Sequence, residues 1–221
     1  MKKVIFLSLF VLVPALLMAQ NRKELSKIRD VISVLDQFAQ DPEEGIPAVF
    51  FEQAEAIAIF PKVIKGGLII GGERGKGVIL IREGKDWSHP AFMILTAGSI
   101  GFQIGGQSAD IILVFKNKET VFNMGKSEFT LGANASIAAG PVGRNIGAKT
   151  EFESEIYVYA RSRGLYAGIS LEGAVIKSDE KANKNFYQKE LTMEEVFEAK
   201  NIKVPYEVKS LQKNLQMAGG N

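Results

Sequence analysis

The chain contains no cysteine and only one histidine, His89, among its 221 residues. The absence of cysteine excludes disulfide bonds, thiolate metal sites and a cysteine nucleophile. It also excludes a lipoprotein anchor, which requires a cysteine at the processing point. A single histidine cannot build a histidine-rich metal centre. We therefore expect neither a metal ion nor another cofactor.

Long apolar runs are also scarce, and the longest lies at the start of the chain. Lys2 and Lys3 precede the apolar run from Val4 to Met18, and Ala19 offers a small-residue cleavage point before Gln20. The run is shorter than the roughly 20 residues of a membrane-spanning helix, which is the alternative interpretation. We expect residues 1–19 to be a cleaved signal peptide and the mature protein to be periplasmic or extracellular, in peripheral contact with a membrane.

The sequence has little excess charge of either sign. The formal net charge is +2, and without Lys2 and Lys3 the basic and acidic residues balance at 25 each. Nucleic-acid-binding proteins usually carry a clear basic excess, so this class is not expected. Any attraction to an acidic partner must come from a local patch.

Helical periodicity marks the first part of the mature chain. Apolar residues recur at helical spacing from Arg22 to Gln40, which predicts an amphipathic helix. Pro47 opens a second helical stretch that we expect to continue to Ile57. Residues 20–60 are thus predicted to form the N-terminal helical part of the domain.

Short aliphatic runs separated by glycine dominate residues 61–190 and predict a glycine-rich β core. The segment from Thr150 to Arg163 alternates apolar and polar residues, so we expect Tyr157, Tyr159, Arg161 and Arg163 on a solvent-exposed face. The glycines indicate bulges and bends that curl a sheet. The predicted fold is α+β: a strongly curved, largely antiparallel, barrel-like sheet flanked by N-terminal amphipathic helices and short C-terminal helices.

The last segment, residues 191–221, is expected to be a helical extension. Thr192 and Glu195 have the spacing of a capping box, and Val208 to Met217 can form a final helix. Between the strands, Lys118 to Met124 is predicted to form a helical turn.

A possible nucleophile occurs in the run Ala97-Gly98-Ser99-Ile100-Gly101, which is similar to a nucleophile elbow with its first glycine replaced. Ser99 would then make the protein a serine hydrolase. A glycine-kinked strand with a buried serine is the favoured interpretation, because the region lacks the strand and helix alternation of that fold. We therefore expect no enzyme.

Basic residues gather between positions 62 and 76, interleaved with apolar ones such as Ile64. An anionic membrane surface attracts such groups by about 1 kcal/mol per charge. The predicted lipid-headgroup ligands are Lys62, Lys65, Arg74 and Lys76. An ordinary solvated rim is the alternative. Arg22, Lys23, Lys27 and Arg29 on the first helix form a second candidate surface.

An ordered series of motifs resembles the SYLF domain, a lipid-binding module of endocytic, actin-regulating adaptors and of exported bacterial proteins. The motifs are Ala58-Ile59-Phe60-Pro61, Lys65-Gly66-Gly67, Trp87-Ser88-x-Pro90, Asp110-Ile111-Ile112, Gly140-Pro141-Val142-Gly143-Arg144, Ser162-x-Gly164-Leu165-x-Ala167-Gly168-x-Ser170-Leu171-Glu172-Gly173, and Asn183 with Phe186-Tyr187. They span almost all of the mature chain.

The resemblance implies binding of acidic lipids, which are phosphoinositides in eukaryotic members, and no enzymatic activity. Some fungal members also bind actin, but an exported protein would not meet actin, so that partner is not expected. Glu55-Ala56 stands where eukaryotic relatives often have Lys-Gly. Arg144 and Glu172 are predicted to be pocket or structural residues.

The expected function is that of an exported, non-catalytic SYLF-domain protein that binds anionic phospholipid or a related amphiphile through its basic patch. The alternative is an envelope protein-interaction or structural module that uses Tyr157, Tyr159, Arg161 and Arg163. A serine hydrolase using Ser99 is a further alternative.

Overall fold

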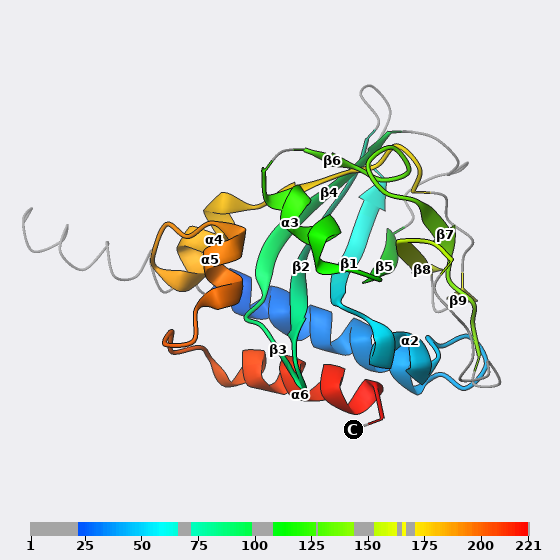
Figure 1. Cartoon of the computed structure of the whole chain (residues 1–221), viewed down its shortest axis with the longest axis horizontal. Coiled ribbons are helices and arrows are strands. Elements are labelled where there is room, and N and C mark those ends of the chain that lie inside the picture. Colours follow the sequence, from blue (N-terminus) through cyan, green and yellow to red (C-terminus); the bar gives the residue numbers. More distant parts are fainter. Residues whose placement is uncertain are drawn as a thin grey trace, which may run out of the picture.

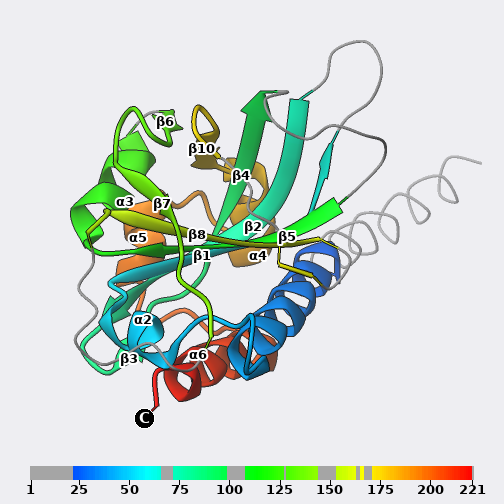
Figure 2. The ribbon, with the colours of Figure 1, turned by 90° about the vertical axis from the view of Figure 1, so that its right-hand side faces the viewer.

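The computed structural model describes residues 22–65, 72–98, 108–126, 128–143, 153–162, 165–166 and 171–220. Their fold is α+β, with a strongly curled sheet packed between helices (Figures 1 and 2). The predicted signal peptide, residues 1–19, lies outside the described residues, and so do Ser99, Arg144 and Arg163. In the part of the chain that is described, no helix has the length and apolar character needed to cross a membrane.

The sheet follows the strand order β6-β10-β4-β2-β1-β5-β8-β7, with β3 paired to β2 and β9 to β8. The pairings are antiparallel except for β7 with β8, which is parallel. The strands are β1 (Ala56–Lys65), β2 (Gly72–Glu83), β3 (Asp86–Trp87), β4 (Ala91–Gly98), β5 (Ser108–Phe115), β6 (Phe129–Thr130), β7 (Ile137–Ala139), β8 (Ile156–Ser162), β9 (Leu165–Tyr166) and β10 (Val175–Ser178). The predicted α+β fold with a barrel-like, largely antiparallel sheet is confirmed.

Helices cover both faces of this sheet (Figure 2). The N-terminal helix spans residues 22–40, as predicted, and buries Ile28, Val31, Leu35 and Phe38. The others are α2 (Ala48–Gln53), α3 (Lys118–Lys126), α4 (Glu180–Tyr187), α5 (Met193–Glu198) and α6 (Tyr206–Ala218). The capping box of Thr192 and Glu195 is present at the start of α5. The predicted final helix is α6.

The second helix is shorter than predicted. It ends at Gln53, and strand β1 already begins at Ala56. Ile57 pairs with Leu80 of β2 on one side and with Val114 of β5 on the other. Pairing with a neighbouring strand on each side outweighs the weak helical preference of this segment, which is rich in alanine and isoleucine.

Strand β8 contradicts the predicted solvent-exposed face. Tyr157, Tyr159 and Arg161 are 7%, 0% and 6% exposed, so the strand is buried on both sides. Phe50 of α2 packs edge-on against both tyrosine rings, and Arg161 lies 4.7 Å over the ring of Phe38. The described part of this face cannot serve as a docking surface for another protein.

The N-terminal helix and α6 run parallel, side by side (Figure 1). Arg29 Nη2 lies 2.7 Å from Glu207 Oε1, and Asn214 Nδ2 donates to Asp36 Oδ1 at 2.8 Å. The two contacts are separated by seven residues along each helix, which is about two turns. The two ends of the described chain therefore form one helical layer.

Candidate functional site

The candidate site lies where β1 and β2 approach their connection. Cross-strand pairing aligns Ser108 of β5, Ile64 of β1, Arg74 of β2 and Thr96 of β4 in one row. Residues directly opposite each other in a sheet share a face, and all four side chains are exposed. We call these four residues the exposed row; with strands about 4.8 Å apart it extends over roughly 14 Å.

The same face is covered at the other end of the strands. Asp110, two residues after Ser108, pairs with Arg161, whose guanidinium donates to the carbonyl of Gln37 in the N-terminal helix. The N-terminal helix thus shields one end of the face, while the exposed row is open to solvent. The exposed row is therefore part of the protein surface and not of the core.

A bulge in β1 places Lys62 beside the exposed row. The register of β1 against β5 shifts between Phe60 and Val63, and Lys62 has a left-handed backbone with φ 51°. Its N–H donates to Asp110 Oδ1 at 2.8 Å, and its Nζ lies 3.2 Å from Asp30 Oδ1 of the N-terminal helix. A lysine side chain in the left-handed region is unusual and marks a local constraint.

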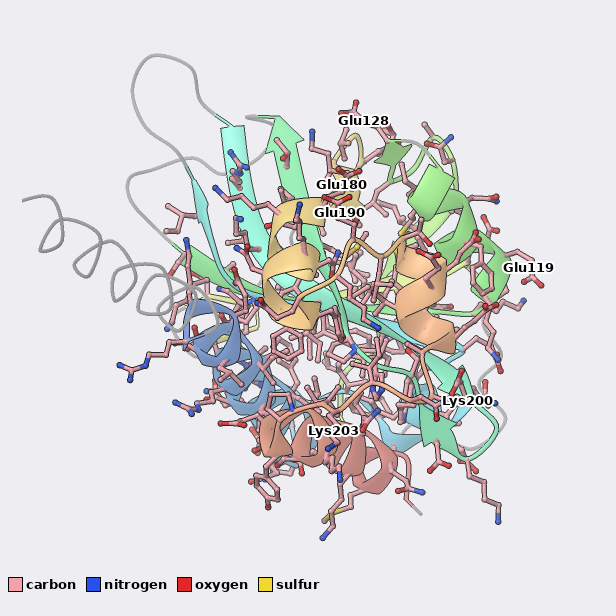
Figure 3. The ribbon with its side chains drawn as sticks, turned by 90° about the vertical axis from the view of Figure 1, so that its left-hand side faces the viewer. Glu119, Glu128, Glu180, Glu190, Lys200 and Lys203 are labelled. Carbon is pink, nitrogen blue, oxygen red and sulfur yellow. The ribbon has the colours of Figure 1, made fainter. Side chains whose placement is uncertain are left out.

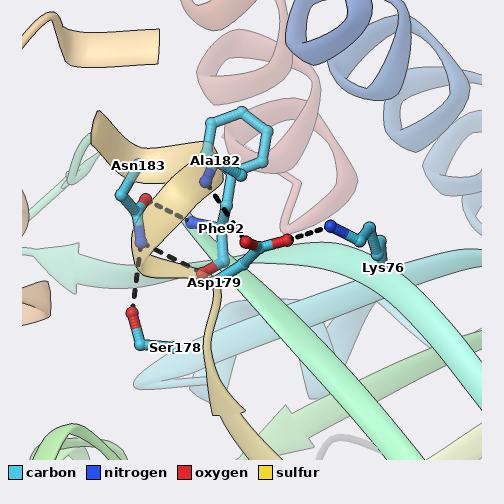
Figure 4. Close-up of polar contacts among 6 residues, drawn as sticks. All are labelled: Lys76, Phe92, Ser178, Asp179, Ala182 and Asn183. Atoms are coloured by element: carbon cyan, nitrogen blue, oxygen red, sulfur yellow. Dashed lines mark hydrogen bonds and ion pairs between the residues drawn. The ribbon is translucent and has the colours of Figure 1, made fainter. Parts of the chain in front are cut away.

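Lys76 has a structural contact. Its ammonium pairs with Asp179, a carboxylate that is 7% exposed and also accepts from the N–H of Ala182 at the start of α4 (Figure 4). Next to it, Asn183 accepts from the N–H of Phe92 at 2.7 Å and donates to the carbonyl of Phe92 at 3.1 Å. This network ties α4 to β2 and β4.

Arg74 differs from both lysines, because it forms no ion pair with another residue of the described part of the chain. It is exposed, and its cross-strand neighbours are Ile64 and Thr96, neither of which carries a charge. Ile64 is 57% exposed, one of the three large apolar side chains so exposed among the described residues. A guanidinium fork beside an exposed apolar group suits a phosphate in a lipid headgroup.

The N-terminal helix brings part of the second predicted surface to the same place. Burial lowers the pKa of Lys27, the carboxylate of Asp30 opposes this shift, and the nearby positive charges of Lys62 and Lys76 add to it. Burial also raises the pKa of Glu24, which is 8% exposed and hydrogen-bonds to Asn185. The two cationic surfaces predicted separately thus adjoin at the bulge.

The predicted residues therefore have different positions. Lys62 and Arg74 lie at the open end of the face, Lys76 braces α4, and the side chain of Lys65 lies outside the described residues. Glu172 is exposed and packs closely against Gly132, but its possible partner Arg144 is outside the described residues. Sequence reasoning missed Asp30 and Asp179, and it named Asp110 only as part of a family motif, because contacts between residues distant in sequence leave no local signal.

One described cavity lies on elements that carry none of the residues of the exposed row. It has a volume of about 510 Å³ and lies between α4, α5 and the end of α3, where Lys181 and Lys184 alternate with Glu180, Glu190 and Glu195. Among the described residues no group of three or more acidic or histidine side chains could hold a metal ion. The mixed charges of this cavity define no ligand class.

Comparison with known proteins identifies the family of the chain. Residues 96–218, from β4 to α6, match the family described as "Ysc84: Las17-binding protein actin regulator". The chain belongs to this family, the Ysc84 or SYLF domain family, so the resemblance seen in the sequence is confirmed. Lys62, Ile64 and Arg74 precede the matched range.

The relatives are longer proteins. The chain is 30% identical over 206 residues to SH3 domain-containing YSC84-like protein 1 of Xenopus laevis, covering 89% of the chain and 61% of that protein. It is 31% identical to Protein YSC84 of Saccharomyces cerevisiae over 201 residues, covering 87% and 42%, respectively. For the Homo sapiens YSC84-like protein 1 the identity is 31% over 180 residues, covering 79% and 52%. The chain thus spans about half the length of these relatives.

Proposed function

We propose that this protein is an exported, non-catalytic SYLF-domain protein that binds anionic phospholipid or a related amphiphile through the exposed row and Lys62. The observation that carries the proposal is Arg74, an exposed guanidinium without a described anionic partner beside the 57% exposed Ile64. A cation near an anionic membrane gains about 1 kcal/mol. Burial of the exposed part of an isoleucine adds about 1 kcal/mol.

Lys62 supports the same proposal. Its ion pair with Asp30 is solvent-exposed, with side chains 66% and 34% exposed, and such pairs contribute little to stability. A headgroup phosphate can therefore replace Asp30 at small cost. Lys76 contributes less, because its charge is balanced by the buried carboxylate of Asp179.

Sedimentation with vesicles tests this function. The protein beginning at Gln20 is incubated with phosphatidylcholine vesicles, with and without phosphatidylglycerol or cardiolipin. We expect recovery only with the anionic vesicles, and we expect the binding to weaken as salt is raised. Equal recovery with neutral and anionic vesicles would contradict the proposal.

A matched pair of charge reversals locates the site. Arg74→Glu changes the exposed row, whereas Lys209→Glu makes the same change in net charge on α6. We expect Arg74→Glu to lower vesicle affinity about tenfold or more, since it replaces an attraction with a repulsion. Lys209→Glu should leave vesicle affinity nearly unchanged, and equal losses in the two variants would show a general charge effect instead.

The absence of catalysis has its own test. None of the matched relatives described above carries the name of an enzyme. We expect no labelling by a fluorophosphonate probe. Labelling that Ser99→Ala abolishes would replace the lipid-binding proposal with the serine hydrolase.

A further inference from the structure

Helix α6 has a free face with an unusual composition. Val208, Leu211 and Leu215 are fully buried, whereas Tyr206 is 80% and Met217 is 60% exposed on the opposite side of the helix. Lys209 and Lys213 lie between them on the same stripe and are exposed. Because a helix rises 1.5 Å per residue, the stripe from Tyr206 to Met217 is about 16 Å long.

A cavity borders this stripe. It has a volume of about 330 Å³ and lies between α6 and strand β3, lined by Asp86, Trp87, Lys209, Gln212, Lys213 and Gln216. Gln212 Nε2 donates to the carbonyls of Trp87 and Ser88 at 2.8 and 3.0 Å, which holds the two walls together. The cavity is therefore preformed, and its volume is at the lower end of the range of ligand pockets, which is ample for one side chain.

One wall of the cavity is a fixed aromatic side chain. Trp87 is 3% exposed, and Arg82 lies 4.5 Å over its ring. The indole N–H is buried and has no hydrogen-bond partner in the described part of the chain.

The exposed stripe of α6 carries two positive charges, and the one acidic residue that lines the adjoining cavity is Asp86. Lys209 and Lys213 form no ion pair with a described residue, and Glu207, the one acidic residue of α6, pairs with Arg29. Lys203 lies beside the start of α6, whereas Glu180 and Glu190 lie at α4 (Figure 3). Charge complementarity therefore favours an acidic partner at α6.

The position of α6 decides between a membrane and a protein as that partner. In both perpendicular views α6 lies at one end of the molecule, and β1 and β2 approach their connection at the other (Figures 1 and 2). A molecule bound to a membrane through the exposed row would hold α6 away from the lipid. This choice of occupant rests on the function proposed above.

We propose that the free face of α6 binds an acidic segment of a partner protein. Lys209 and Lys213 contact its carboxylates, and the cavity beside Trp87 accepts one of its side chains. Tyr206 and Met217 provide apolar contact area at the two ends, and tyrosine is among the residue types that contribute most at interfaces. The surface is distinct from the buried Tyr157 and Tyr159.

Phage display tests this surface. A random peptide library is selected on the immobilised protein in the absence of lipid. We expect enrichment of acidic peptides that contain an apolar residue. The double variant Lys209→Glu with Lys213→Glu should bind them at least about tenfold more weakly, and Tyr206→Ser should weaken them as well. The matched control, Lys181→Glu with Lys189→Glu, reverses two exposed charges elsewhere and should bind as the wild type does.

Several results would overturn the proposal. One is a selection in which acidic peptides are not enriched. Another is selected peptides that bind the Lys209 and Lys213 double variant with the same affinity as the wild type. Loss of anionic vesicle binding in that variant would assign α6 to lipid, and dimerisation that it abolishes would assign α6 to a second copy. Because the selection contains no lipid, its outcome is separable from the vesicle experiment.

Discussion

The N–H of Lys62 donates to Oδ1 of Asp110 at 2.8 Å and supports a left-handed backbone, φ 51°, at the bulge of β1. For a residue other than glycine this conformation costs roughly 1 kcal/mol. The bulge brings a lysine beside the exposed row. Strain that persists at such a place is typical of functional sites.

Lys62→Gly should therefore separate stability from binding. We expect the glycine variant to be more stable to denaturant by about 1 kcal/mol, because glycine adopts this backbone without strain. The ion pair with Asp30 is exposed, so its loss subtracts little. Vesicle affinity should fall at the same time, because a headgroup contact is lost.

Gln188 offers the matched control, because it has a similar left-handed backbone, φ 54°, at the end of α4. Gln188→Gly should gain similar stability and bind anionic vesicles as the wild type does. The strain argument fails if Lys62→Gly is less stable than wild type. The role of Lys62 fails if its glycine variant binds vesicles unchanged.

Asn183 should be important for stability, because it is 1% exposed. Its side-chain amide forms hydrogen bonds with the backbone of Phe92, as a neighbouring strand would do. Asn183→Ala removes the acceptor of the Phe92 N–H, while the carbonyl of Phe92 still accepts from the N–H of Asp179 at 2.8 Å, so the loss should be about 2 kcal/mol. Urea unfolding measures the loss. Lys184→Ala, on the exposed side of the same helix, should change stability by no more than about 0.5 kcal/mol; similar losses in both variants would contradict this role.

Arg82 should act as a clamp between the end of α2 and strand β3. Its Nε donates to the carbonyl of Ala54 at 2.7 Å, and its guanidinium lies over the ring of Trp87. Burial lowers its pKa. Arg82→Met should lower stability by about 2 kcal/mol, and Arg82→Lys should recover only part of that loss, because an ammonium lacks the planar fork.

The fluorescence of Trp87, the single tryptophan, reports this unfolding directly. A fully stable Arg82→Met variant would contradict the clamp.

His89 should make stability depend on pH. Burial lowers its pKa, an effect that the charge of Glu83 only partly offsets, and Nδ1 is buried without a described partner. The unfolded chain thus binds a proton more readily than the folded one. Stability should fall as pH drops below about 6.5, the pKa of an unperturbed histidine, and should level off below the folded pKa.

Unfolding measured between neutral and mildly acidic pH, for wild type and His89→Gln, isolates this effect. Glu24, whose pKa burial raises, contributes in the opposite direction in both proteins. The difference in the free energy of unfolding between wild type and His89→Gln should therefore change steadily in favour of the variant as pH falls. Parallel curves would show that His89 is not responsible.

Local sequence patterns predicted the helices well. The stripe in residues 22–40, the capping box of Thr192 and Glu195, and the final helix all depend on neighbours within four residues. Tyr159 and Arg161 were misplaced because their covering groups are distant in sequence. Phe50 and Gln37 lie more than 100 residues away.

The candidate site shows the same division. The basic residues at positions 62 to 76 are visible in the sequence, and so is the apolar residue between them. Their partners Asp30 and Asp179 come from the N-terminal helix and from the start of α4. Only the folded chain shows that Arg74 and Lys62 lie at the open end while Lys76 is a brace.

The most direct test places a tryptophan at each end of the molecule. Ile64→Trp reports on the exposed row, and Tyr206→Trp reports on α6, while the buried Trp87 is common to both variants. With phosphatidylglycerol vesicles, the emission of Ile64→Trp should shift to shorter wavelength, and the emission of Tyr206→Trp should not change. A shift at position 206 with none at position 64 would contradict the proposed membrane-binding surface.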